Sequence, residues 1–212
     1  MKKILPPLLV LFFSMVFPPA QGHAQQAAPP DNSAPASITK YEDIISNDYS
    51  IGIQGGYGDK VWDNDHFRLN TALLQPYFTI PLTNVIMKDW ITRGVLEYKL
   101  EVPLGLITTL DDHGMAGLSP LGFRYDFTGL RDRLVPYASA SFGMVYLDVP
   151  HEVQGTRYNF IINAAIGAQY FITGKWTIGA ECRFLHLSNA GIKEPNRGQN
   201  YLMGLVQIGR YF

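Results

Sequence analysis

Much of this chain alternates apolar and polar residues with a period of two. The clearest case is the segment 157–170, in which every second residue is apolar and the apolar set begins and ends with tyrosine. Successive side chains of a strand point to opposite faces, so the pattern predicts a strand with one apolar face. Aromatic residues at both ends of such a face are typical of a strand that crosses a bilayer. The apolar set is Tyr158, Phe160, Ile162, Ala164, Ile166, Ala168 and Tyr170.

The same alternation recurs along the chain, and we expect about eight strands in all. Further strands are predicted over 96–102, 121–127, 134–146, 176–184 and 201–212, and less regular ones over 49–57 and 67–82, the latter weakened by Pro76 and Pro81. The faces opposite the apolar ones carry charges of both signs, which can pair inside a small barrel. We therefore expect an all-β fold, an eight-stranded antiparallel transmembrane β-barrel. The charged set is Glu97, Lys99, Glu101, Arg124, Asp126, Glu181 and Arg183.

A soluble, secreted lipid-binding barrel is the alternative, because it would present the same charges to solvent. Three features favour the membrane: the targeting segment described next, the aromatic strand ends, and a chain that stops on Tyr211-Phe212. A terminal phenylalanine on an amphipathic strand resembles the sorting signal of bacterial outer-membrane barrels. The expected location is therefore the bacterial outer membrane.

The first residues of the chain have the pattern of a targeting segment. Lys2 and Lys3 precede an apolar run over 4–17, and Gly22-His23-Ala24 is a small-x-small cleavage site. We expect a signal peptide over 1–24, a disordered leader rich in Gln, Ala and Pro over 25–40, and the barrel over 41–212. The net charge of −1, without a basic patch, argues against a nucleic-acid partner.

A candidate site lies where the strand beginning at residue 176 ends. His186 and Ser188 are two residues apart, so both side chains share one face, roughly 7 Å apart at the backbone. A serine with a base in reach is the minimum for nucleophilic ester cleavage. Strand parity directs the pair toward lipid, and the alternation of short and long connections places it near the outer headgroups. A plainer interpretation is that both are polar residues of the membrane interface.

From residue 181 onward the chain resembles the C-terminal signature of the lipid A 3-O-deacylase family. The resemblance rests on Arg183, His186-x-Ser188-Asn189-Ala190, the following Asn196-x-Gly198 and the final phenylalanine. It implies an outer-membrane esterase that removes an ester-linked acyl chain from lipid A, the membrane anchor of lipopolysaccharide. Ser188 would be the nucleophile and His186 the base, while Asn189 with nearby backbone N–H groups stabilises the oxyanion and Asn196 supports the loop. Such an esterase needs neither a metal nor another cofactor.

The chain departs from the family pattern at one position. The best-studied members of the family carry a glutamate twelve residues after the serine to orient the histidine, and this chain has Asn200 there. Parity places Asn200 beside His186, where an amide can hold the tautomer, as asparagine does in Cys-His-Asn proteases, without stabilising the imidazolium. Glu194 of the same loop is a weaker candidate for the missing carboxylate. A structural or adhesion barrel without catalysis therefore remains the alternative function, and a homodimer remains open.

Other polar residues have less specific expectations. Arg157, Lys193 and Arg197 lie on predicted external loops, where they either bind lipid A phosphates or are ordinary solvated charges. Glu181 is expected inside the barrel, paired with Arg183 or Arg124, and Cys182 is expected to face lipid. The histidines outside the candidate site are dispersed over predicted loops and form no predicted metal site: His66, His113 and His151.

Overall fold

The computed structural model describes residues 40–62, 70–82, 94–108, 113–128 and 133–212. The predicted signal peptide, residues 25–39 of the predicted leader, and His66 lie outside these ranges. Among the described residues, no helix is both long and hydrophobic enough to cross a bilayer.

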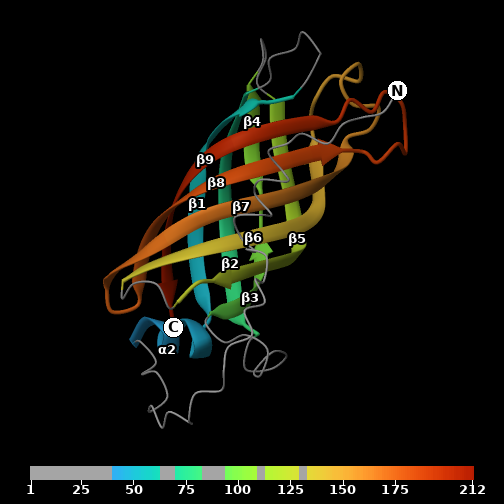
Figure 1. Ribbon diagram of the computed structural model, residues 1–212. Coiled ribbons are helices and arrows are strands. Elements are labelled where there is room, and N and C mark those ends of the chain that lie inside the picture. The colour runs from blue at the N-terminus through green and yellow to red at the C-terminus, as the bar shows by residue number, and fades with distance from the viewer. Residues whose placement is uncertain (1–39, 63–69, 83–93, 109–112, 129–132) are drawn as a thin grey trace, which may run out of the picture. The chain divides into compact units, whose positions relative to one another are not determined.

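The strands form one closed antiparallel barrel (Figure 1). Neighbours along the chain pair with each other, and the barrel closes because β1 pairs with both β2 and β9. Strands β3 and β4 are two parts of one crossing, since each pairs with β2 and β5, so the nine strands make eight crossings. The predicted eight-stranded barrel is confirmed. The strands are β1 (Ser50–Lys60), β2 (Asn70–Pro81), β3 (Val95–Glu101), β4 (Leu104–Thr108), β5 (His113–Asp126), β6 (Leu134–Leu147), β7 (Tyr158–Thr173), β8 (Trp176–Ser188) and β9 (Gln199–Tyr211).

The third crossing is interrupted at Pro103, which has no N–H to donate to a neighbouring strand. Hydrogen bonds on either side keep the wall continuous: Val102 N donates to Pro76 O at 3.0 Å, and Gly117 N donates to Pro103 O at 2.9 Å. Strand β2 continues through Pro76, which lies opposite Ile53 of β1. The barrel wall therefore stays continuous at both prolines.

Charged side chains fill the middle of the barrel interior, as the alternation predicted. Arg183 donates from Nε to Glu181 at 2.6 Å and from Nη2 to Glu101 at 2.9 Å, and Lys99 Nζ lies 2.8 Å from Glu101. In a second group, Arg124 pairs with Asp126. All these side chains are almost fully buried, so pairing offsets the cost of removing them from water. The expected Glu181–Arg183 pair is confirmed.

Apolar clusters close the interior on both sides of these ion pairs. At the end of the barrel where the chain terminates, the unpredicted helix α2 (Lys40–Asn47) packs Ile44 and Ile45 against Phe171 and Tyr211. The helix therefore plugs that end (Figure 1). At the other end a larger cluster, which includes Leu185, Leu187 and Tyr201, fills the interior beneath the loops.

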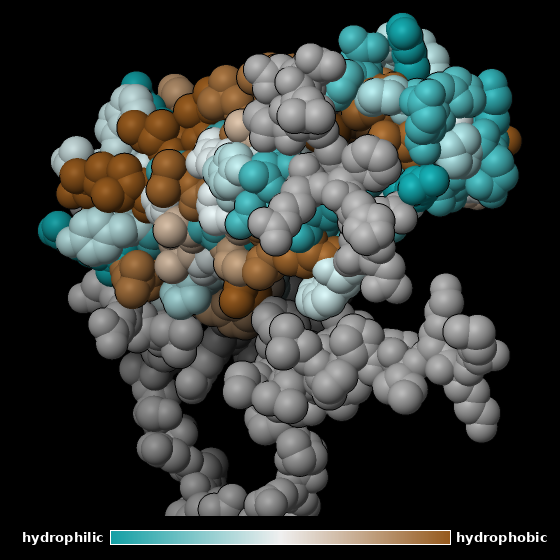
Figure 2. Space-filling view, turned by 90° about the horizontal axis from the view of Figure 1, so that it is seen from above, coloured by the Kyte–Doolittle hydropathy of each residue, from teal (hydrophilic) through white to brown (hydrophobic). Residues whose placement is uncertain are grey.

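Three connections mark the two ends of the barrel. The turn 174–175 between β7 and β8 lies at the end that holds α2 and Phe212, which we call the turn end. The β6–β7 connection (148–157) and the β8–β9 connection (189–198) lie at the opposite end, the loop end. Figure 2 shows hydrophobic side chains over the barrel wall and hydrophilic ones gathered toward one end. Cys182 is exposed on the wall, as expected.

Candidate active site

His186 connects two polar side chains at the loop end of the barrel. Its Nε2 lies 3.0 Å from Ser188 Oγ, and its Nδ1 lies 2.7 Å from Asn200 Oδ1. Ser188 follows His186 on the same face of β8, whereas Asn200 is the direct cross-strand partner of His186 on β9. Side chains directly opposite on neighbouring strands share a face, so the register itself brings the three together. All three are partly buried.

The two hydrogen bonds define the tautomer of His186. The carboxamide oxygen of Asn200 can only accept, so the Nδ1 atom facing it carries the proton. In the neutral ring Nε2 is then unprotonated and accepts from the Ser188 hydroxyl. A serine whose hydroxyl donates to an oriented imidazole is arranged for general-base activation.

Asn189 forms hydrogen bonds within the loop that follows Ser188. Its side chain is fully buried; Nδ2 donates to Lys193 O at 2.6 Å, and Oδ1 accepts from Gly191 N at 2.9 Å. Its backbone N–H donates to Asn196 Oδ1 at 3.0 Å. Between these bonds stands Ala190, at a φ of 54°, whose N–H meets no acceptor in the part of the chain that the structure describes.

The β8–β9 loop is also fastened to the β6–β7 loop. Gln154 forms an isolated antiparallel bridge with Asn196, and its Nε2 donates to Arg197 O at 3.1 Å. Gly155 N donates to Pro195 O at 2.6 Å. A Cβ at Gly155 would lie only 2.5 Å from the carbonyl oxygen of Glu194, so this approach requires glycine. The β8–β9 loop beside Ser188 is therefore held both by its own hydrogen bonds and by the β6–β7 loop.

Aromatic side chains flank the His186–Ser188 pair on the outer face of the barrel. Phe160 lies directly opposite Ser188 on β7 and stacks on Phe142, with ring centroids 5.7 Å apart. On the other side Trp62 packs on Phe184, with centroids 5.5 Å apart. The His186–Ser188 pair therefore borders an apolar, aromatic surface on the outside of the barrel.

The model of the family "Lipid A 3-O-deacylase (PagL)" matches residues 83–208, which is more than half of the chain.

The chain belongs to the lipid A 3-O-deacylase family.

Solved structures agree with this assignment at the level of the fold. The outer membrane enzyme PagL matches with a TM-score of 0.55 at 19% identity, over 74% of this chain and 97% of that one. Neisserial surface protein A (NspA) matches with a TM-score of 0.52 at 11% identity, over 77% of this chain and 97% of that one. No curated protein matches the chain significantly. This lipid A 3-O-deacylase family member is thus a bacterial outer-membrane barrel.

The residues predicted from the sequence fall into two sets in this family member. His186, Ser188 and Asn200 lie together in one hydrogen-bonded row, and Asn189 and Asn196 lie in the adjoining loop, bonded to each other. Glu194 is bonded elsewhere, because its Oε2 accepts from Asn196 N at 3.0 Å.

Sequence reasoning missed two contributors to this region. Gly198 lies so close to His186 that a Cβ there would be 3.1 Å from Cε1 of the ring, and Gln154 bridges the two loops from a distant segment. Gly198 belongs to the Asn-x-Gly motif, so the sequence pattern marked this residue. The pattern did not predict that Gly198 lies against the ring of His186. For Gln154 the sequence holds no such signal.

Proposed function

We propose that this protein is a serine esterase that removes an ester-linked acyl chain from lipid A by 3-O-deacylation. The observation that carries the proposal is the row Ser188–His186–Asn200, with contacts of 3.0 and 2.7 Å, on the lipid-facing side of the barrel. The family assignment supports the substrate class.

The reaction follows from the roles that the geometry allows. Ser188 Oγ attacks the ester carbonyl carbon while its proton passes to His186 Nε2. The tetrahedral intermediate collapses, the C–O bond to the sugar breaks, and His186 returns the proton to the leaving alkoxide. Water then attacks the acyl-serine by the same route and releases the fatty acid and free Ser188.

Oxyanion stabilisation is assigned to the backbone after Ser188. The N–H of Ala190 is the available donor, and the buried Asn189 side chain together with Asn196 holds that backbone in place. Preorganised donors of this kind contribute because they need no rearrangement when charge develops.

Asn200 distinguishes this chain from the family pattern. Its amide oxygen fixes the tautomer of His186 but is a neutral dipole, so it stabilises the imidazolium less than a carboxylate would. This difference is the observation that favours the alternative function, a non-catalytic structural barrel. The proposal predicts instead that the protein turns over its substrate slowly.

Covalent labelling tests the esterase chemistry. A long-chain alkyl fluorophosphonate, which reacts with activated serines, is incubated with the folded protein in detergent micelles, and the labelled peptide is mapped by mass spectrometry. The proposal predicts label on Ser188 that is lost in His186→Ala. A folded barrel that stays unlabelled would support the structural alternative instead.

A further inference from the structure

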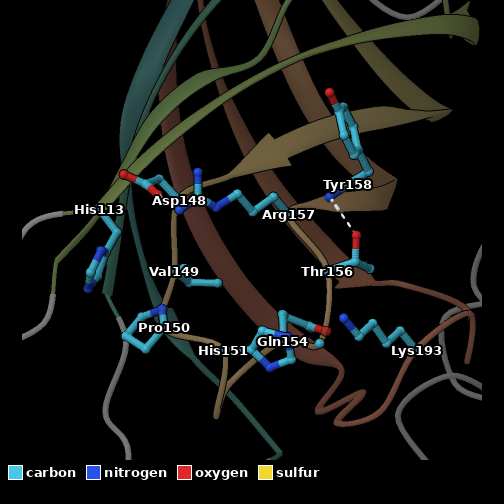
Figure 3. Close-up of a pocket in the computed structure, with 11 residues that line it drawn as sticks. His113, Asp148, Val149, Pro150, His151, Gln154, Thr156, Arg157, Tyr158 and Lys193 are labelled. Atoms are coloured by element: carbon cyan, nitrogen blue, oxygen red, sulfur yellow. Dashed lines mark hydrogen bonds and ion pairs between the residues drawn. The ribbon is translucent and has the colours of Figure 1, made fainter.

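A cavity of about 610 Å³ opens at the loop end of the barrel, separate from the His186–Ser188 row. It lies between the start of β5, the β6–β7 loop and the β8–β9 loop (Figure 3). Four of its lining side chains are basic, and among the described residues only one is acidic. The basic residues are His113, His151, Arg157 and Lys193, and the acidic one is Asp148.

The cationic groups of this cavity are weakly compensated. Arg157 lies 3.7 Å from Asp148, but both side chains are more than half exposed, so the pair is worth little. Arg157 Nη1 also donates to Tyr146 Oη at 2.7 Å, which orients the guanidinium without neutralising it. Lys193 forms no ion pair within the described ranges. Two full positive charges against one negative favour an anionic ligand, and Arg with Lys is a common combination for phosphate.

A buried amide adds a second kind of recognition. Gln154 lines the cavity and is 2% exposed. Its Nε2 is occupied by Arg197 O, whereas its Oε1 is buried and has no hydrogen-bond partner among the described residues. Figure 3 shows Lys193 extending from the β8–β9 loop toward Gln154 and Thr156. A carbonyl oxygen accepts from a hydroxyl or an amide N–H, so a small rearrangement would let this site bind a sugar next to a phosphate.

The cavity is physically linked to the nucleophile. Lys193 O accepts from the side chain of Asn189, the residue after Ser188. On β7, the cavity residue Tyr158 lies two positions before Phe160, and Phe160 is the direct cross-strand partner of Ser188 on β8. Two strand residues span roughly 7 Å. A headgroup in the cavity would thus lie beside Ser188 on the side toward the cell exterior, above the apolar surface that receives the acyl chain.

We propose that this cavity binds the phosphorylated sugar headgroup of the lipid substrate and thereby selects which ester reaches Ser188. The inference rests on the proposed function for its catalytic consequence, while binding itself is independent of it. Arg157 and Lys193 hold the phosphate, and Gln154 accepts from a hydroxyl or N–H of the sugar.

Kinetics with two substrates test the selection. Arg157→Gln, Lys193→Gln and the double variant are compared with wild type on lipid A that retains its phosphates and on the same lipid A after enzymatic dephosphorylation. Lys175→Gln, a loss of one positive charge at the turn end, is the matched control. Each cavity variant is expected to raise KM for the phosphorylated substrate roughly 3- to 10-fold and to leave its kcat unchanged. For the dephosphorylated substrate, both KM and kcat are expected to stay unchanged. Equal losses on both substrates, or none in the double variant, would overturn the inference.

Binding separates this inference from the proposed function. Saturation-transfer NMR with glucosamine 1-phosphate is recorded in the Ser188→Ala background, with and without the double substitution. Binding that the double substitution abolishes supports the cavity even if the wild type releases no fatty acid. Inorganic phosphate that competes as well as the sugar phosphate would show a simple anion site, and an absence of binding would contradict the proposal altogether.

Discussion

His186 Nδ1 lies 2.7 Å from the carboxamide oxygen of Asn200, its direct partner across the β8–β9 pair. This contact places a neutral amide oxygen, and not a carboxylate, against the ring nitrogen of His186. In the proposed catalytic row, Asn200 therefore orients His186 but does not supply the negative charge that would stabilise a protonated imidazole.

Asn200→Asp isolates the effect of that charge. Aspartate has the same length as asparagine, so a carboxylate oxygen would occupy the position of Oδ1 without moving His186. We expect kcat to rise, by roughly tenfold or more, because the carboxylate stabilises the imidazolium of the transition state. Asn200→Glu should retain or increase activity, and Asn200→Leu should lower it. If Asn200→Asp loses most activity, the amide has a specific role that a carboxylate cannot supply.

Gly198 provides a steric test of the position of His186. A Cβ at this residue would lie 3.1 Å from Cε1 of the ring, so any larger side chain must displace the imidazole. Gly198→Val is expected to lower kcat by at least about tenfold, with heat-modifiable gel migration unchanged. Gly204→Val on the adjoining strand β9 is the matched control, because a Cβ there meets nothing within 4 Å. Equal kinetics for the two variants would show that the ring position is not critical.

Asn196 distinguishes support of the loop from direct contact with the oxyanion. Its Oδ1 accepts from Asn189 N, a bond that aspartate could also make. If Asn196 only holds the loop, Asn196→Asp should keep most of the activity and Asn196→Ala should lose roughly tenfold. Inactivity of both variants in steady-state assays would instead assign the Asn196 amide to the oxyanion, where a negative charge is harmful.

The buried ion pairs allow a prediction about stability. Arg183→Leu removes the cation that lies 2.9 Å from Glu101 and 2.6 Å from Glu181 and leaves Lys99 alone beside both buried carboxylates, which should cost about 3 to 5 kcal/mol in the free energy of unfolding. Lys175→Gln removes only the partly exposed pair with Asp48 and should cost less than about 1 kcal/mol. Urea titration of tryptophan fluorescence in lipid vesicles measures both, and similar losses would contradict the role assigned to the interior charges.

The long β-strands were predictable because one face of each strand meets lipid and is apolar, so apolar and polar residues alternate clearly along it, as in 134–146 and 157–170. The short β4 was not, because it follows Pro103 and has only five residues. Helix α2 was missed because its apolar contribution is little more than Ile44 and Ile45, and its role depends on the barrel that it closes.

The candidate site was partly predictable for a related reason. His186, Ser188 and Asn200 are brought together by strand parity and register, which a sequence pattern reports. The cavity is assembled from three separate segments, so His113 and His151, interpreted as dispersed, in fact line one space. Loop contacts such as that between Gln154 and Asn196 leave no periodic signal.

The most direct test of the account is the mass of lipid A before and after incubation with the purified barrel in detergent micelles. Wild-type protein should remove one ester-linked acyl chain. Ser188→Ala, folded to the same heat-modifiable form, should leave the mass unchanged. Lipid A that keeps its full mass with folded wild-type protein, or that loses the same chain with Ser188→Ala, would contradict the account.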